Sequence, residues 1–358
     1  MSSEINRNES ERGATPRLHA LAVIAVCLVW PLIWVGGLVT TYDAGMAVPD
    51  WPGTYGYNLF LYPISTWLYG PFDLLIEHGH RLLGAVVGFV AIGMLVAAFL
   101  HEKRRWVIGL TVLILGAVIS QGALGGVRVL LGDRTVAMIH GCFGPVVFAL
   151  CCIAATVTGK RWWPSAAESP DRKLALEPSR IGRGMLAVAT LVLGLSYAQL
   201  VFGALLRHVQ PTTTPGSFTL TVAVHIMTAL FLWLLTPILW LGVRKCGDMT
   251  LCGLAKWLIL FVGAQILLGT GTWIVNYGWP SVLSFAPFGE GFLVRAKGFL
   301  DSMIVTAHVA VGSLILATAA VILVRTLRQR CLTGSTSVQP KSGAVPLEMT
   351  GLPVAATV

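Results

Sequence analysis

Charged residues are scarce in this sequence of 358 residues. Asp, Glu, Lys and Arg make up 11% of the chain, whereas apolar residues make up 55%. A soluble domain carries about 25% charged residues, and a core of ordinary size does not bury so much apolar surface. The scarcity of charge therefore excludes an ordinary soluble globular protein and indicates that lipid surrounds most of the chain.

Basic residues are absent from the long segment 41–79, although it carries Asp43, Asp50, Asp73 and Glu77. If the N-terminus is cytoplasmic, the inner segments hold 19 of the 25 Lys and Arg residues and the outer segments hold six. Cytoplasmic loops carry such an excess, so we predict an N-in/C-in topology. The same bias accounts for the net charge of +9, and no nucleic-acid partner is required.

Cysteines are absent from the predicted outer segments. None of the seven lies there, and no CxxC pair of the kind that binds metals is found. Disulfides form in oxidising compartments, so we expect none on the outer face. We interpret the seven cysteines as small buried residues or inner-side thiols. The N-terminal tail contains Glu4, Glu9 and Glu11, whereas mitochondrial presequences are poor in acidic residues, and this favours a bacterial plasma membrane.

The apolar residues gather in eight stretches that are long enough to cross a bilayer. A helix needs about 20 apolar residues to span the hydrocarbon, and its backbone groups must be satisfied internally there. The stretches lack the alternating pattern of barrel strands. We predict an all-α integral membrane protein with eight transmembrane helices, over residues 18–40, 80–100, 106–130, 136–158, 183–206, 219–243, 252–275 and 302–325.

A polar, proline-containing segment at 159–182 divides these spans four and four. We interpret it as a cytoplasmic linker between an N-terminal four-helix bundle, 18–158, and a C-terminal four-helix bundle, 183–326. Residues 1–17 form a cytoplasmic tail. Residues 327–358 lack helical periodicity, and we expect a disordered cytoplasmic tail there.

A weak internal repeat suggests that the two bundles are pseudo-symmetric. Gln121, Gln199 and Gln265 each precede a glycine by four residues, in predicted spans three, five and seven. Residues four apart share a helix face. A glycine there most often marks a helix–helix contact, but a glutamine in lipid needs a polar partner.

Four of the eight histidines occupy equivalent positions. His80, His140, His225 and His308 each lie near the start of an even-numbered span, whereas His78 is placed in the preceding loop. A single helical histidine is more often a hydrogen-bonded core residue than a ligand, but ionisable groups in a membrane are costly and usually functional. Two histidines from opposite corners of a bundle suit a haem iron with two axial ligands. Zinc is disfavoured because its further ligands are missing.

Charged side chains accompany these histidines. Arg81, Arg128 and Arg207 lie at outer helix ends, where guanidinium groups suit haem propionates; ordinary interfacial snorkelling is the alternative for each. Glu77 lies one turn before His80. It is interpreted either as an acid–base group above a haem edge or as a solvated acid at a helix start. At the water boundary we expect its burial to be partial.

The chain resembles the heme A synthase family over residues 18–326. The resemblance rests on GGLVTTYDAGMAVPDWP after the first span, on EHGHR opening the second, and on single histidines opening spans four, six and eight. It implies a membrane oxidoreductase of heme biosynthesis. Such an enzyme oxidises the methyl group of heme O to a formyl group through alcohol intermediates, and the product, heme A, serves cytochrome oxidase assembly.

The resemblance also implies roles for single residues. His80 and His140 would bind the iron of the substrate, heme O, with Glu77 as the catalytic carboxylate. His225 and His308 would be the ligands of a permanent heme B. Some members carry paired cysteines in outer loops, and their absence here excludes a thiol step at those loops.

Two other functions remain as alternatives. The first is a non-catalytic di-haem b-type membrane cytochrome that relays electrons. The second, a transporter, is disfavoured because broken helices and midplane charges are not seen. The expected partners of the enzyme are heme O delivered by a heme O synthase, an electron donor and membrane lipid, and a homo-oligomer is compatible with the sequence.

Overall fold

The computed structural model describes residues 15–162, 182–246, 248–280 and 298–335, and these form helices and loops without a β-strand. Eight of the helices are long and apolar enough to cross a membrane, which confirms the predicted all-α fold with eight spans. They are α2 (Pro16–Thr41), α4 (Phe72–His101), α5 (Arg105–Leu131), α6 (Arg134–Thr158), α8 (Arg183–Arg207), α9 (Pro215–Val243), α10 (Met249–Tyr277) and α11 (Phe299–Ser335).

Local signals in the sequence set several helix ends. At the start of α6, the Asp133 carboxylate accepts hydrogen bonds from the backbone N–H groups of Thr135 and Val136, at 2.6 and 2.9 Å. Asp248 caps α10 in the same way, as short acidic residues do at helix N-termini. The helix α5 ends at Gly132, whose φ of +59° suits glycine.

The helix α4 begins at Phe72, two turns earlier than the apolar pattern predicts. The polar residues in these two turns interrupt the apolar run, but protein covers them instead of water. His78 is 1% exposed, and its Nδ1 lies 3.0 Å from the Thr54 hydroxyl. The placement of His78 in a loop is therefore wrong, because burial by the segment before α4 lets the helix extend.

The helix α11 continues to Ser335, so the predicted tail of 327–358 begins inside a helix. The amide of Gln329 donates to the Asp248 carboxylate at 3.1 Å, and Arg325 lies 3.9 Å from the same carboxylate. These contacts attach the end of α11 to the start of α10. The remainder of that predicted tail, and most of the predicted linker 159–182, lie outside the described residues.

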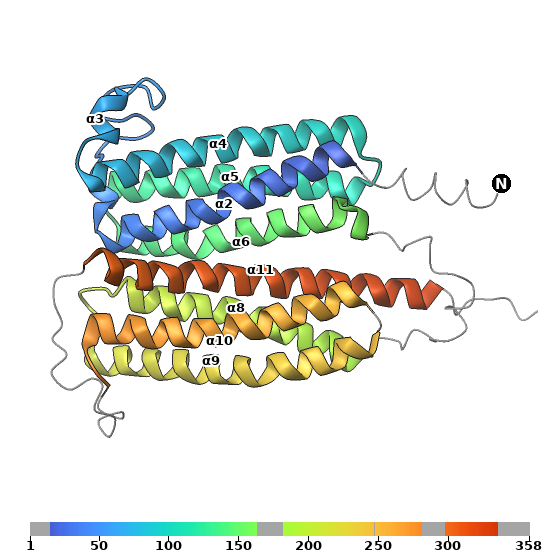
Figure 1. Ribbon diagram of the computed structural model, residues 1–358. Helices are drawn as coiled ribbons and strands as arrows, with labels where there is room; N and C mark the ends of the chain where they lie inside the picture. Colours follow the sequence, from blue (N-terminus) through green and yellow to red (C-terminus); the bar gives the residue numbers. More distant parts are fainter. Residues whose placement is uncertain (1–14, 163–181, 247, 281–297, 336–358) are drawn as a thin grey trace, which may run out of the picture.

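The helices form two groups of four (Figure 1). In the first half, α2, α4, α5 and α6 pack around an apolar cluster, and in the second half α8, α9, α10 and α11 pack around another. The two halves meet where α11 packs against α2 and α6. The pseudo-symmetry of the halves stays a prediction.

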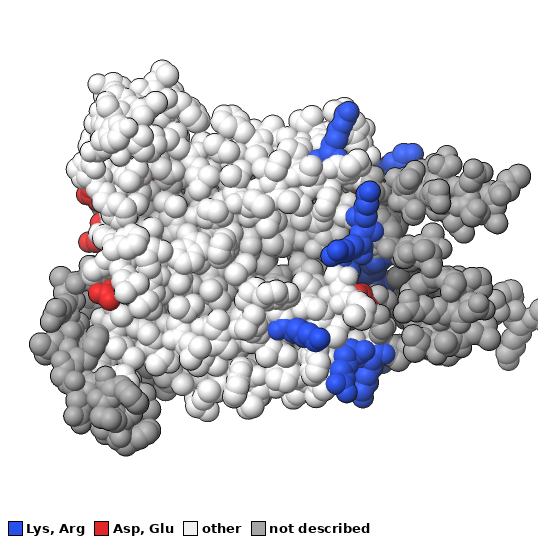
Figure 2. Space-filling model, viewed as in Figure 1, with Lys and Arg blue, Asp and Glu red and all other residues white. Residues whose placement is uncertain are grey.

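Charge is distributed unevenly along the molecule. Figure 2 shows Lys and Arg gathered at the end where α4 and α11 finish, whereas most of the visible acidic residues lie at the opposite end. We call the acidic end, where α4 and α11 begin, the outer end, in accord with the predicted N-in/C-in topology. The topology itself stays a prediction.

Candidate functional site

The four helical histidines form two pairs. His80 on α4 faces His140 on α6, with ring centroids 6.4 Å apart and ring planes at 76°. His225 on α9 faces His308 on α11, with centroids 6.3 Å apart and planes at 70°. The structure thus brings together, within each half, the two histidines that the sequence places at equivalent helix positions.

The spacing within each pair fits a metal bound by both rings. A metal–nitrogen bond of about 2 Å on each side, plus about 1 Å from nitrogen to ring centre, gives a centroid separation of about 6 Å. The Nδ1 atoms of His80, His225 and His308 are buried without a hydrogen-bond partner. In His140, Nδ1 lies 3.2 Å from the Gln121 carbonyl oxygen, an arrangement that orients a ligating ring.

The donor set also fits haem. Among residues 15–162, 182–246, 248–280 and 298–335, no group of three or more His, Cys, Asp or Glu side chains is placed to hold a metal ion. Each pair therefore offers two ligands on opposite sides of a metal. Haem iron with two axial histidines needs this number, because the macrocycle supplies the remaining ligands.

Each histidine ring packs against a glycine of a neighbouring helix. A Cβ atom built on that glycine would lie only 2.9 to 3.2 Å from the ring, closer than a side chain tolerates without movement. The glycines thus provide room that a larger residue would fill. The contacts join Gly36 to His80, Gly125 to His140, Gly203 to His225 and Gly269 to His308.

The repeated glutamines also contact the histidines. The amide groups of Gln121 and Gln265 donate to the backbone carbonyls of His140 and His308, each at 2.8 Å. The third glutamine places its amide nitrogen 3.3 Å from the ring of its histidine, His225. The Gln–Gly repeat, which in the sequence suggested two related bundles, therefore positions three of the four histidines.

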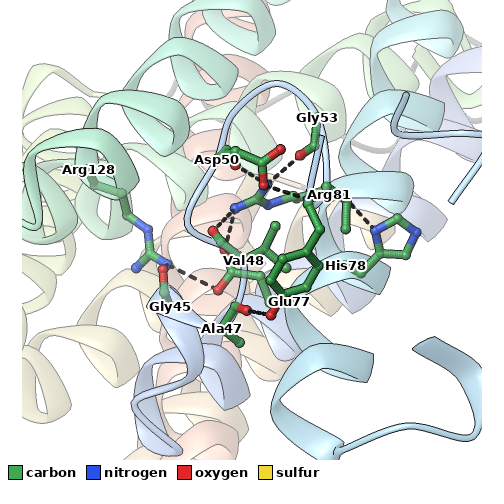
Figure 3. Close-up of polar contacts among 11 residues, drawn as sticks. Gly45, Ala47, Val48, Asp50, Gly53, Glu77, His78, Arg81 and Arg128 are labelled. Carbon is green, nitrogen blue, oxygen red and sulfur yellow. Dashed lines mark hydrogen bonds and ion pairs between the residues drawn. The ribbon is translucent and has the colours of Figure 1, made fainter. Parts of the chain in front are cut away.

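Arg81 attaches the segment before α4 to the outer end of that helix (Figure 3). Its guanidinium donates to the carbonyl oxygens of Val48, Asp50 and Gly53, at 2.8, 2.6 and 2.9 Å. It also donates to the Glu77 carboxylate at 2.8 Å. In the structure Arg81 holds this segment; its predicted role toward a propionate stays a prediction.

Glu77 is buried between two arginines. It is 3% exposed, so the expected partial burial is wrong; the segment before α4 covers it. Its Oε1 is held by Arg81, whereas Oε2 lies 3.9 Å from Nη2 of Arg128 and has no hydrogen-bond partner. Arg128 also donates to the Gly45 carbonyl at 3.2 Å. Two positive charges thus compensate one buried carboxylate.

Residues 44–57, which we call the outer cap, include the GMAVPDWP motif. The Asp50 carboxylate accepts hydrogen bonds from the backbone N–H groups of Tyr55 and Gly56, at 2.7 and 2.9 Å. Burial by itself raises the pKa of Asp50, but these hydrogen bonds and the charge of Arg81 outweigh it, so the pKa lies below its ordinary value. The carboxylate therefore stabilises the cap as an anion.

The outer cap also packs on α5. A Cβ atom at Gly126 would lie 2.4 Å from the Trp51 indole, so only glycine permits this contact. Sequence reasoning gave no partner to Trp51 or Asp50. Their only signal was the density of Gly, Pro and Asp, which is typical of tight turns.

Arg207 lies at the outer end of α8, beside the second pair. Its Nη2 donates to the Gly37 carbonyl and to the Thr41 hydroxyl of α2, each at 2.7 Å. Its Nη1 is buried without a partner. This arrangement suits a carboxylate bound near the second pair.

A family model described as a cytochrome oxidase assembly protein, COX15-CtaA, matches residues 19–220 of the chain. The matched segment contains the first histidine pair, the outer cap with Arg81 and Arg128, which bind it, and Glu77 and Arg207. The second histidine pair lies beyond it. None of the curated proteins matches the chain significantly.

Proposed function

The chain belongs to the COX15-CtaA family of cytochrome oxidase assembly proteins, the heme A synthases, and we propose that it oxidises the methyl group of heme O to the formyl group of heme A through alcohol intermediates. The match confirms the resemblance found in the sequence. The observation that carries the finer proposal is the combination of a histidine pair, His80 and His140, with the buried carboxylate of Glu77 one helical turn away.

In this proposal the first pair binds the substrate. His80 and His140 hold the iron of heme O between them, and Gly36 and Gly125 keep their rings in place. The outer cap excludes water from the outer end of the site. Exclusion of water strengthens the interactions among the charged groups beside the substrate.

Glu77 is the proposed proton acceptor. Arg81 anchors Oε1, whereas Oε2 has no hydrogen-bond partner. When an alcohol intermediate with two hydroxyl groups loses water to give the formyl group, a positioned carboxylate takes the proton from one hydroxyl and returns it to the departing hydroxyl. Arg128 compensates the charge of the carboxylate when the proton has left.

The second pair is the proposed site of a permanent heme B, held by His225 and His308. This group supplies one-electron transfer when bound. Arg207, whose Nη1 has no partner, would pair with a carboxylate of this group. We further propose that the protein lies in a bacterial plasma membrane and receives heme O from a heme O synthase.

A di-haem cytochrome that only relays electrons is the alternative. The surroundings of the two pairs speak against it. Three residues before His225 and His308 the chain has Val222 and Val305, where the first pair has Glu77. A relay has no need of a buried carboxylate beside one of its two metal sites.

The test is the haem composition of membranes in which the chain is expressed with a heme O source. Glu77→Gln should abolish heme A, accumulate heme O or its alcohol, and leave heme B in place. Glu102→Gln is the matched control, because Glu102 is also buried and paired with an arginine at 2.7 Å, but lies at the other end of α4. Formation of heme A by Glu77→Gln at the unmodified rate would contradict the proposal.

A further inference from the structure

The helix α2 is held by the second half at its outer end. The two hydrogen bonds of Arg207 reach Gly37 and Thr41 from α8. The Thr41 hydroxyl lies 3.4 Å from the hydroxyl of Thr306 on α11. Deeper in the membrane, the Trp30 indole donates to the Ala310 carbonyl at 3.3 Å. Although α2 belongs to the first half, three side chains tie it to the helices that carry or flank the second histidine pair.

Two adjacent glycines of α2 contact different halves of the protein. A Cβ atom at Gly36 would lie 2.9 Å from the His80 ring, and one at Gly37 would lie 2.8 Å from Thr306. Thr306 precedes His308 by two residues. Since packed elements transmit small shifts rather than absorbing them, a displacement of α2 at this level changes its contacts with His80 of the first pair and with α11, the helix that carries His308.

Arg207 retains one unused donor group at this junction. Nη1 is buried and has no partner, whereas both contacts of the guanidinium run through Nη2. The adjacent His208 does not compete for an anion, because burial and the charge of Arg207 lower its pKa to about 4. Among the residues that the structure describes, Arg207 therefore offers an unused donor to a carboxylate at the second pair.

We propose that Arg207 is a positioning residue that couples the two histidine pairs through α2. A haem carboxylate bound by Nη1 fixes the guanidinium, the guanidinium holds the carbonyl of Gly37, and the neighbouring Gly36 then stays against His80. Binding at the second pair thereby strengthens binding at the first, and the coupling is reciprocal by thermodynamic linkage. The proposal rests on the proposed haem sites, but it does not depend on the reaction at the first site.

The test measures ferric heme B binding at the first pair of the purified full-length chain while the second pair is intact and filled. Two further forms each keep one pair: His225→Ala with His308→Ala leaves the first pair, and His80→Ala with His140→Ala leaves the second. The absorbance of the low-spin bis-histidine complex reports the dissociation constant of the added heme B. This readout requires no turnover.

In the chain with both pairs, heme B at the second pair should tighten binding at the first relative to the first-pair form, and Arg207→Gln should remove this gain. Arg207→Gln should also weaken binding by about tenfold in the second-pair form, where a charged hydrogen bond is lost. Arg207→Lys keeps the charge but not the planar set of donors of Arg, so it should restore binding at the second pair without restoring the gain at the first. Arg134→Gln is the control and should change neither form, since Arg134 is exposed and donates only to the Val209 carbonyl.

Thr41→Val provides a second variant in case the Arg207 variants fail to fold. It keeps the shape of the side chain and replaces the hydroxyl with a methyl group. It should weaken binding to the second-pair form, although Thr41 belongs to the first half, and it should reduce the gain at the first pair. A first pair that binds equally well with the second pair filled or removed, or a gain that survives in Arg207→Gln, would overturn the coupling. If neither form binds heme B through its histidines, the haem sites themselves are wrong and the coupling falls with them.

Discussion

The two histidine pairs differ less in their own geometry than in what surrounds their outer ends. Their ring centroids are 6.4 and 6.3 Å apart, and each ring rests on a glycine. Beside the first pair lie a buried carboxylate, two arginines and a folded cap, whereas the described residues beside the second pair provide Arg207. The same arrangement of two histidines can therefore serve different chemistry, which depends on the groups placed around it.

Removal of single histidine ligands should have the largest effect and should differ between the two pairs. His308→Ala or His225→Ala should abolish the low-spin bis-histidine signal of the isolated protein, because the permanent haem loses an axial ligand. His80→Ala should keep that signal and instead abolish heme A formation. The electron paramagnetic resonance spectrum and the extracted haems of matched samples measure both outcomes. Retention of the signal in both second-pair variants would reject the assignment of the two sites.

Substitution of the glycines should have a smaller effect, limited to the pair that each glycine contacts. Gly36→Ala places a Cβ 2.9 Å from His80, and Gly269→Ala places one 3.0 Å from His308, so each should lower haem occupancy several-fold at its own pair. Gly263→Ala is the control on α10, since its added Cβ has no atom within 4 Å. Haem content per protein measures the effect. Equal losses in all three variants would show that the ring contact is not responsible.

Acidification should loosen the outer cap, which is a feature of the first half. The pKa of Asp50 is lower in the folded protein than its ordinary value of 3.8. Its contribution to stability is therefore complete above about pH 4 and is lost as the pH falls through the folded value. Protease cleavage within 44–57 reports the opening, and Asp50→Asn should make the cap open already at neutral pH. An unchanged cleavage profile in this variant would contradict the role of the carboxylate.

The smallest expected effect tests whether both pairs lie at the outer end. Thiol reagents confined to the outside of intact cells should not label the natural chain, because its cysteines lie in helices or in predicted inner segments. Ser65→Cys supplies a positive control, since this residue is exposed in the short helix α3 (Ile64–Leu68). Labelling of the natural chain would overturn the topology and, with it, the common outer placement of the two sites.

Much of the fold follows from local patterns of residues. Hydropathy over about 20 residues predicts where the chain enters lipid, because each span must satisfy its backbone alone. The same rule made His140, His225 and His308 conspicuous, as ionisable residues inside apolar runs. Helix caps such as Asp133 and Gly132 are likewise readable, since they act on neighbouring backbone groups.

The partners of these residues were decided only by the tertiary structure. Glu77 was expected at the water boundary, and it is buried because a segment some 25 residues earlier folds over it. Arg81 uses its donors on that segment, and Arg207 bonds to α2, which is 166 to 170 residues away in the chain. The segments that enter the membrane, and the polar residues within them, follow from the sequence alone, because lipid acts on each segment separately. The contacts that distinguish the two sites depend on which helices pack together, and no local pattern contains that information.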